Sequence, residues 1–220
     1  MWKRILLKKG YKLNFSNKKY ILYLVTNEIL DDNILVEKVE RAILGGVNVV
    51  QLRDKEISSK RMLQRAKKLK ELTEKYKVPL IINDRLDIAL AVDAEGLHVG
   101  QDDLPIEVCK KHFKGIIGVS TSNKLQAIKA YESGADYIGY GAIFSTESKN
   151  DYNLINNEIS EIKNNVKIPI VGIGGIKHFH VKELVEQGLD GVAVISAIMG
   201  KEDPQKAAKR FVEEFKDYLN

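Results

Sequence analysis

The chain has 220 residues, of which 44% are hydrophobic and 30% are charged, and its formal net charge is +5 at pH 7. This length suits one domain with a full buried core, and the composition is ordinary for a soluble globular protein. Lysines and arginines alternate with acids along the helical segments, so the positive charge predicts solvated helix faces and no nucleic-acid partner.

Residues 1–19 form a basic N-terminal extension, MWKRILLKKGYKLNFSNKK. The extension lacks the apolar core and the small-residue cleavage site of a signal peptide, so we expect it to stay in the mature protein and to pack as a helix across the rest of the chain. No apolar run approaches membrane-spanning length, which argues against a membrane partner. The single cysteine, Cys109, excludes an internal disulfide and fits a cytoplasmic location.

Eight short apolar, β-branched segments recur along the chain. They lie at residues 20–26, 47–52, 79–83, 96–100, 116–120, 137–141, 169–174 and 191–196. Because these segments are nearly continuous in apolar character and do not alternate with polar residues, they predict strands that are buried on both faces, as in a parallel sheet.

Amphipathic segments separate the predicted strands. The first has its apolar residues from Leu35 to Ile43 on one helical face. We expect Asp32 or Asn33 to cap its start and Gly45 to close it. The other helices are predicted from about Ser58 to Tyr76 and over residues 105–112, 123–133, 156–164, 179–187 and 203–218.

Strand and helix units in this number and order predict a single α/β domain, a (β/α)8 or TIM barrel, over residues 20–220. The alternative is an open doubly wound sheet, which normally carries a glycine-rich phosphate loop after its first strand. Here the first predicted strand leads into TNEILDDN, which contains no glycine. Glycines gather instead after the seventh strand and near the eighth, where barrels commonly bind phosphate.

Polar side chains follow the second predicted strand. Alternation along the strand would point Gln51, Arg53 and Lys55 to one side. Two cations and an amide that converge in this way suit a pyrophosphate, which arginine binds as a fork and lysine as a point charge. The alternative interpretation is an exposed charged turn.

Carboxylates follow the third and fourth predicted strands. Asp84 and either Asp102 or Asp103 would face each other on adjacent loops, near the cations, as the hard oxygen ligands that Mg²⁺ prefers. Each aspartate alone is more often a helix cap, since Asp103 stands shortly before Pro105. The pair together favours a metal site.

The remaining candidates follow the later strands. One hydroxyl of Ser120, Thr121 and Ser122 is expected to face a substrate while another caps the next helix. The long segment 141–151 is a candidate lid that closes over phosphate oxygens. The adjacent glycines at 174 and 175 would let backbone N–H groups approach a phosphate, with a helix terminus behind them. His98 stands within a strand, so we expect it to pack and not to bind a metal.

Taken in order, these motifs resemble the thiamine-phosphate synthase (thiamine-phosphate pyrophosphorylase) family, from about Tyr20 to the C-terminal helix. The matching segments are QLRDK (51–55), INDRLDIAL (82–90), GLHVGQDDLP (96–105), IIGVST (116–121), GADYIGYGAIF (134–144), TESK (146–149), IPIVGIGGI (168–176) and GVAVISAI (191–198). The resemblance implies a transferase of thiamine biosynthesis that joins a hydroxymethylpyrimidine diphosphate to a methyl-thiazole ethyl phosphate, with Mg²⁺ as its cofactor. It implies that pyrophosphate leaves first and that no protein nucleophile is needed.

The resemblance also implies roles for individual residues. The pyrimidine diphosphate would be bound by Tyr23, Gln51, Arg53, Lys55, Asn83, Ser120 and Lys149. The thiazole phosphate would be bound by Thr146, Ser148, Gly175, Ile195 and Ser196. The metal would be bound by Asp84 and Asp103. As catalytic residues, Arg53, Lys55 and Lys149 would stabilise the departing charge.

Three residues of the lid depart from the pattern of the family, which usually has two prolines and a second threonine where this chain has Ala142, Ser145 and Ser148. Two other functions stay open. A thiazole tautomerase would share this barrel but typically has a histidine at the place of Ala142. A non-catalytic phosphate-binding barrel would have no need of metal ligands beside cations. The sequence leaves open whether the chain forms a homo-oligomer.

Overall fold

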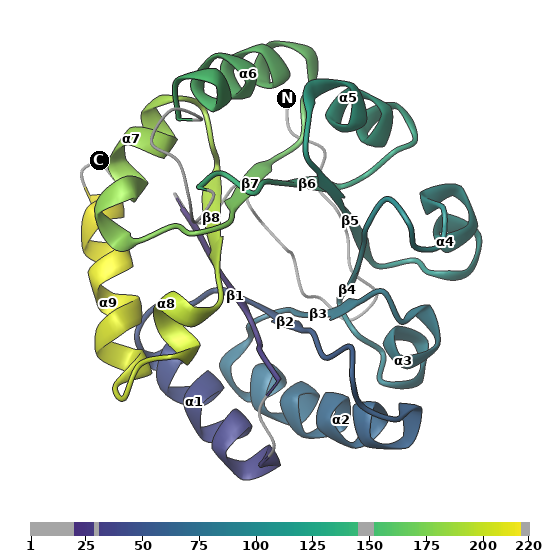
Figure 1. Cartoon of the computed structure of the whole chain (residues 1–220). Coiled ribbons are helices and arrows are strands. Elements are labelled where there is room, and N and C mark those ends of the chain that lie inside the picture. The colour runs from purple at the N-terminus through teal and green to yellow at the C-terminus, as the bar shows by residue number, and fades with distance from the viewer. Residues whose placement is uncertain (1–19, 29–30, 145–151, 217–220) are drawn as a thin grey trace.

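The computed structural model describes residues 20–28, 31–144 and 152–216. Within these ranges eight parallel strands close into a barrel, in which each strand pairs with the next along the chain and β8 pairs with β1 (Figure 1). The strands are β1 (Ile21–Val25), β2 (Val49–Leu52), β3 (Leu80–Asn83), β4 (Gly96–Val99), β5 (Ile116–Thr121), β6 (Tyr137–Tyr140), β7 (Ile170–Ile173) and β8 (Gly191–Val194). The predicted (β/α)8 barrel is confirmed, and the open doubly wound sheet is wrong because such a sheet has no β8–β1 pair.

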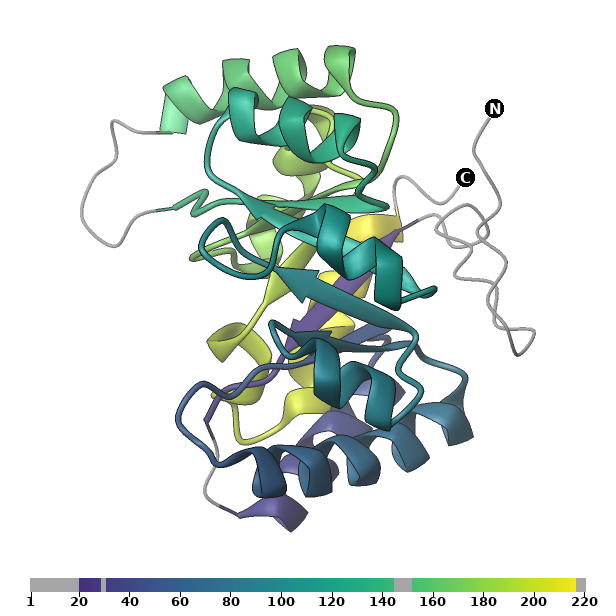
Figure 2. The same cartoon turned by 90° about the vertical axis from the view of Figure 1, so that its right-hand side faces the viewer.

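Helices surround the barrel, with α5 and α6 on one side and α1 and α2 on the opposite side (Figure 2). The helices are α1 (Asp32–Leu44), α2 (Ser59–Tyr76), α3 (Leu86–Ala91), α4 (Ile106–His112), α5 (Lys124–Glu132), α6 (Tyr152–Asn165), α7 (Val181–Glu186), α8 (Ser196–Met199) and α9 (Pro204–Phe215), with a 3₁₀ turn, η1, at His178–His180. In the described part of the chain, no helix has the length and apolar character needed to cross a bilayer.

Each strand buries both of its faces, which explains its continuous apolar sequence. In β1, Leu22 and Leu24 belong to the core between barrel and helices, whereas Ile21, Tyr23 and Val25 belong to the cluster inside the barrel. All of these side chains are less than 5% exposed. Polar side chains buried in either layer need hydrogen-bonding partners of their own.

The ends of the first two helices follow from capping chemistry. Asp31 caps α1, since its carboxylate accepts hydrogen bonds from the backbone N–H groups of Asn33 (2.8 Å) and Ile34 (2.9 Å). The predicted caps, Asp32 and Asn33, are therefore wrong by one residue or more, because Asp32 is the first residue of the helix itself. The predictions of Gly45 at the end of α1 and of a start of α2 near Ser58 are confirmed.

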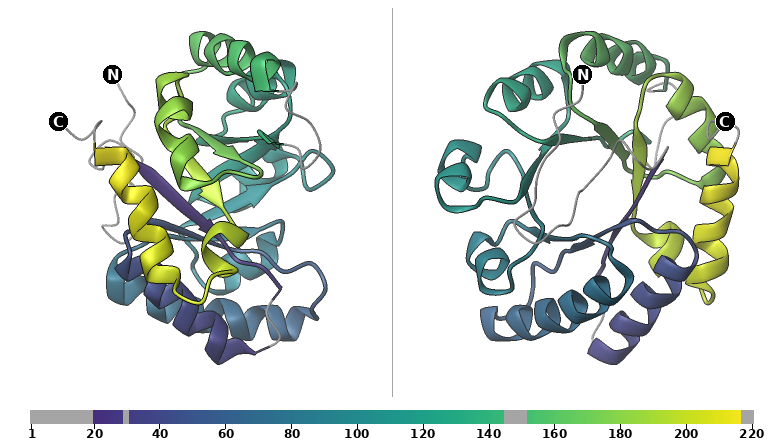
Figure 3. Two further views of the ribbon diagram at one scale, coloured as in Figure 1. Left: turned by 60° about the vertical axis from the view of Figure 1, so that its left-hand side comes forward. Right: turned by 180° about the vertical axis from the view of Figure 1, so that it is seen from behind.

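Helix α9 completes the ring by lying between α7 and α1 (Figure 3). At its end Phe215 stacks on Tyr20, with ring centroids 5.0 Å apart. The helix begins at Pro204, and the last two residues of the predicted span 203–218 lie outside the described residues. Helix α6 begins earlier than predicted. The predicted helical extension, residues 1–19, lies outside the described residues and stays a prediction.

A repeated hydrogen bond closes the N-terminal end of the barrel. The residue just before each even-numbered strand accepts a hydrogen bond from a backbone N–H of the preceding odd-numbered strand. The pairs are Asn48 with Leu22 N (3.1 Å), Glu95 with Leu80 N (3.0 Å), Asp136 with Ile117 N (2.9 Å) and Asp190 with Ile170 N (2.8 Å). These three acids and one amide each satisfy a backbone donor near the N-terminal end of an odd-numbered strand. Polar groups at this end therefore serve stability, and the opposite end is where barrels place their chemistry.

Candidate functional site

The loop after β2 is held at the C-terminal rim of the barrel by its own backbone. Thr26, which follows β1, donates its hydroxyl to the Arg53 carbonyl (3.1 Å) and accepts a hydrogen bond from the Arg53 N–H (3.0 Å). Two residues later, Lys55 Nζ lies 3.6 Å from an oxygen of Asp84. The loop is thus tied to both neighbouring strand ends, with Arg53 half-buried and the Lys55 side chain 52% exposed. The exposed charged turn and the pyrophosphate site both stay open as interpretations of these cations.

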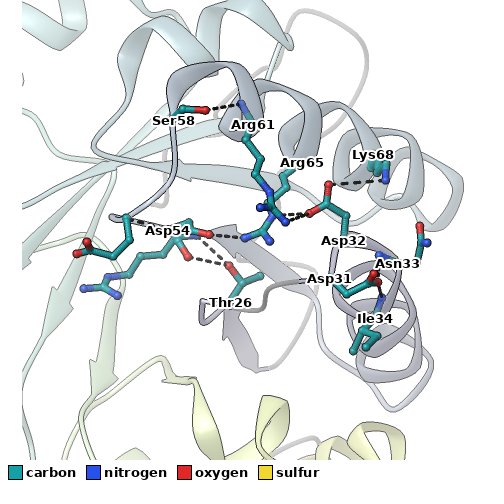
Figure 4. Close-up of polar contacts among 12 residues, drawn as sticks. Thr26, Asp31, Asp32, Asn33, Ile34, Asp54, Ser58, Arg61, Arg65 and Lys68 are labelled. Atoms are coloured by element: carbon teal, nitrogen blue, oxygen red, sulfur yellow. Dashed lines mark hydrogen bonds and ion pairs between the residues drawn. The ribbon is translucent and has the colours of Figure 1, made fainter.

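A buried ion-pair cluster connects this loop to helices α1 and α2 (Figure 4). The side chain of Asp54, between the two cations, is 1% exposed and forms an ion pair with Arg65 of α2. The Arg65 guanidinium, 2% exposed, also donates to Asp32 of α1 (2.7 Å), and this hydrogen bond is the main reason that the pKa of Asp32 is lowered. The sequence analysis missed this cluster. The signal was a cation at position 65 on the apolar face that Met62 and Leu69 define.

The carboxylates of Asp84 and Asp103 lie side by side. The pKa of Asp84 is raised to about 6, mainly by burial and then by the hydrogen bond to Asp103 and the charge of Asp103, against the opposing effect of Lys55. Neither aspartate is a helix cap: α3 and α4 begin after Arg85 and Pro105, with no side-chain cap. Instead, Asp103 accepts a hydrogen bond from the Gly100 N–H (2.7 Å).

Backbone conformation directs Asp84 toward this pair. The residue has a φ of 61°, in the left-handed region that aspartate tolerates better than most residues, and its N–H donates to the His98 carbonyl (2.8 Å). Asp102 is exposed, so Asp103 is the member of the acidic loop that meets Asp84. Asn83, the last residue of β3, is buried just before the pair.

This pair can hold a hard cation. Among the described residues no group of three or more histidines, cysteines or carboxylates could hold a metal ion. Mg²⁺, however, usually takes only one or two carboxylates from a protein and fills its other positions with water and phosphate oxygens. Two adjacent carboxylates with one raised pKa repel each other, and a divalent cation between them would relieve that repulsion.

A chain of hydrogen bonds crosses the barrel just beneath the rim. It runs from Gln51 Nε2 to the Tyr23 hydroxyl, from there to the Tyr137 hydroxyl, then through His98 Nδ1 and Nε2 to Ser120 Oγ, and each of its four bonds is 2.8 Å long. The five residues come from five different strands. Burial lowers the pKa of His98 to about 4, so the ring is neutral near pH 7.

Two members of this chain were not expected there. The sequence analysis expected His98 only to pack, and it did not single out Tyr137. Both are buried, but both ring nitrogens of His98 are engaged by hydroxyl groups. Strand alternation was the available signal, since positions 96, 98 and 100 of β4 and its loop share the inward side with Ser120 of β5. Asn123, and no serine or threonine, caps α5.

The ends of β7 and β8 form the opposite side of the rim. Gly174 and Gly175 have φ values of 103° and 60°, and a Cβ on Gly175 would lie 2.9 Å from Phe144 Cβ. They line a pocket of about 960 Å³ together with Ile195 and Ser196. Ser196 opens α8 and does not end β8 as predicted, and the helix expected after the glycines starts as the short turn η1.

The candidate lid is described only at its start. The segment leaving β6 is tied to the end of β7, because Ile143 N–H donates to the Ile173 carbonyl (2.8 Å) and Phe144 N–H donates to the Gly174 carbonyl (3.2 Å). Ala142 is exposed beside these contacts. Thr146, Ser148 and Lys149 lie outside the described residues, so their expected roles stay predictions.

Known proteins share both the sequence and the fold. The family model for thiamine monophosphate synthase matches residues 22–198. A thiamine-phosphate synthase of Alkaliphilus oremlandii is 52% identical over 194 residues, covering 86% of this chain and 93% of the relative. One of Clostridium tetani is 51% identical over 206 residues, covering 92% and 99%. The solved structure of a thiamine phosphate pyrophosphorylase from Pyrococcus furiosus is similar with a TM-score of 0.82 at 38% identity, over 92% of this chain and 98% of that one. This chain therefore belongs to the thiamine monophosphate synthase family.

Proposed function

We propose that this chain is a thiamine-phosphate synthase, a transferase that condenses 4-amino-2-methyl-5-hydroxymethylpyrimidine diphosphate with 4-methyl-5-(2-phosphoethyl)thiazole to give thiamine phosphate and pyrophosphate. The observation that carries the proposal is the Asp84–Asp103 pair next to Lys55, directly above the polar chain inside the barrel. Carboxylates beside cations suit a metal-bound diphosphate, and the buried polar chain suits a heterocycle with hydrogen-bonding edges.

In the proposed reaction the bond between the pyrimidine methylene carbon and the diphosphate oxygen breaks first, and its electron pair leaves with pyrophosphate. The lone pair of the thiazole nitrogen then forms the new C–N bond. No group of the protein forms a covalent intermediate, so catalysis rests on positioning and on stabilising the departing charge. Arg53, Lys55 and Lys149 would supply the positive charge that stabilises the leaving pyrophosphate.

The other residues would bind and orient the two substrates. Asp84 and Asp103 would hold Mg²⁺, which when bound supplies positive charge to the diphosphate oxygens. Asn83 would join the cations at the diphosphate. Gln51, Tyr23 and Ser120 would bind the pyrimidine. The thiazole phosphate would be bound by Gly175, Ile195, Ser196, Thr146 and Ser148.

An endpoint assay tests the proposal. The purified chain is incubated with both substrates and Mg²⁺, and thiamine phosphate and pyrophosphate are measured. Equal amounts of both products are expected, together with their loss on addition of EDTA and recovery with excess Mg²⁺. A folded chain that forms neither product would overturn the proposal. The same sample would then be tested for isomerisation of the thiazole, although exposed Ala142 offers no base for a tautomerase. The cytoplasmic location stays a prediction.

The ion-pair cluster under the β2 loop predicts a selective binding defect. Asp54→Asn is expected to raise the KM for the pyrimidine diphosphate about tenfold, or about 1.4 kcal/mol, because the loop that carries Arg53 and Lys55 loses its charged tie to Arg65. The KM for the thiazole phosphate is expected to stay within twofold.

Asp32→Asn is the matched control for this variant. Asp32 contacts the same guanidinium but lies on α1, away from the loop. Steady-state kinetics with each substrate varied in turn measure the effect. Equal KM changes in the two variants would show that the cluster only stabilises the fold.

A further inference from the structure

The row of hydrogen bonds inside the barrel has one favoured direction from donor to acceptor, and the Gln51 amide determines it. The Gln51 amide nitrogen donates to the hydroxyl of Tyr23 (2.8 Å) and also hydrogen-bonds to Tyr137. Both phenol oxygens are thereby acceptors at this end of the chain. Among the described residues, the Tyr23 hydroxyl has Gln51 and Tyr137 as its hydrogen-bonding neighbours. Its own proton can therefore find an acceptor only at the Tyr137 oxygen.

The reverse direction would be costly. If His98 Nδ1 carried the proton and Tyr137 donated to Tyr23, the Tyr23 phenol would have its proton buried without an acceptor. Tyr23 is 2% exposed, so water could not replace the missing partner. An unsatisfied buried donor costs about 1–3 kcal/mol, which corresponds to a preference of roughly 5-fold to 150-fold for the other arrangement.

The favoured direction carries through the imidazole to the rim. Tyr137 donates to His98 Nδ1 (2.8 Å), so the proton of the neutral ring lies on Nε2 and is donated to Ser120 Oγ (2.8 Å). Ser120 is half-buried at the mouth of the barrel, and its hydroxyl oxygen already accepts this hydrogen bond. The Ser120 hydroxyl proton is then left to point to a ligand.

We infer that His98 and Tyr137 are positioning residues, which fix the Ser120 hydroxyl as a hydrogen-bond donor toward an acceptor nitrogen of the bound pyrimidine ring. The inference rests on the proposed function for the identity of the ligand. Neither residue has to touch the substrate for this role. They select the Nε2–H tautomer of the imidazole, which determines whether Ser120 presents a donor or an acceptor.

The tautomer of His98 can be measured without an activity assay. Nitrogen NMR of the chain labelled at its histidines distinguishes Nε2–H from Nδ1–H rings. The chain contains four histidines, so replacing His112, His178 and His180 with glutamine leaves the signal of His98 alone. We expect a neutral Nε2–H ring from pH 6 to pH 8. An Nδ1–H ring or a protonated ring in this range would overturn the inference.

The effect on the ligand is tested by Tyr137→Phe, with Tyr140→Phe as the matched control. Both tyrosines belong to β6, but the Tyr140 hydroxyl donates outward to Glu158 (2.5 Å), on the helix side of the barrel. Calorimetric Kd values for the pyrimidine diphosphate in Mg²⁺ are expected to rise about tenfold in Tyr137→Phe and less than twofold in Tyr140→Phe, with the affinity for the thiazole phosphate unchanged in both.

The outcomes separate the inference from the proposed function. Equal losses of affinity in the two variants would overturn the positioning role, whereas a loss confined to Tyr137→Phe supports it. If Tyr137→Phe fails to fold, the tautomer of His98 measured by NMR still tests the positioning role. If the chain binds the pyrimidine diphosphate and forms no product, the proposed function is overturned while the positioning role stands.

Discussion

Asp84→Asn is expected to lower kcat/KM by roughly 10²–10³-fold, the loss seen when a group that stabilises developing charge is removed. Asparagine keeps the shape of the side chain and tolerates the left-handed backbone at this position, where φ is 61°. The substitution therefore removes one charge of the carboxylate pair without adding backbone strain. The residual activity is expected to need a higher Mg²⁺ concentration.

The same variant is expected to be at least as stable as the parent in EDTA. The pKa of Asp84 is raised to about 6, above that of an aspartate in an unfolded chain. The folded state then binds more protons than the unfolded state between about pH 4 and pH 6, so ionisation of Asp84 lowers stability as the pH rises through that window. At pH 8 the charged Asp84 is destabilising, and asparagine removes that cost.

Asp102→Asn is the control, because Asp102 is exposed in the same acidic segment as Asp103. Kinetics at varied Mg²⁺ and thermal unfolding at pH 8 measure both effects. A loss of activity in both variants would show that the overall negative charge of this part of the rim matters, and not the Asp84–Asp103 pair. Full activity of Asp84→Asn would remove the aspartate pair from the proposed metal site.

The fold was predictable because each strand can be recognised from its own sequence. A barrel strand must be apolar on both faces, so its sequence is recognisable without knowledge of its partners. Short helices cannot be recognised from their own sequence in this way. Helices α3 and α8 have 6 and 4 residues, too few for a clear helical period, and the sequence analysis did not predict either. The cap at Asp31 was also missed, since three acceptable capping residues stand in a row from 31 to 33.

The candidate site was predictable only where neighbouring loops converge. Asp84 was expected beside either Asp102 or Asp103 because the C-terminal ends of adjacent parallel strands meet at one rim, and the family resemblance favoured Asp103. The contacts of His98 with Tyr137 and of Arg65 with Asp32 join residues 39 and 33 positions apart, and each involves a buried side chain. A buried polar residue in a single sequence resembles a tolerated core position, and only the fold shows the partner that satisfies it.

Loss of Glu95 is expected to have the largest effect on stability, at the end of the barrel opposite to Asp84. Glu95 and Lys70 form a buried ion pair, and the second carboxylate oxygen accepts a hydrogen bond from the Leu80 N–H (3.0 Å). Glu95→Ala leaves a buried ammonium and a strand N–H without this carboxylate, so the free energy of unfolding should fall by about 3–5 kcal/mol.

Glu74→Ala is the matched variant for this prediction, because Glu74 pairs with the same Lys70 at 3.3 Å but has a side chain that is 43% exposed. An exposed pair of this kind contributes about 0–1 kcal/mol. Urea unfolding of both variants measures the difference, and kcat/KM below the unfolding transition should be unchanged in each. Similar losses of stability in the two would mean that burial does not strengthen the Glu95 contact. A loss of activity in folded Glu95→Ala would couple the two ends of the barrel, contrary to a division in which the N-terminal end stabilises the fold and the C-terminal rim binds substrates.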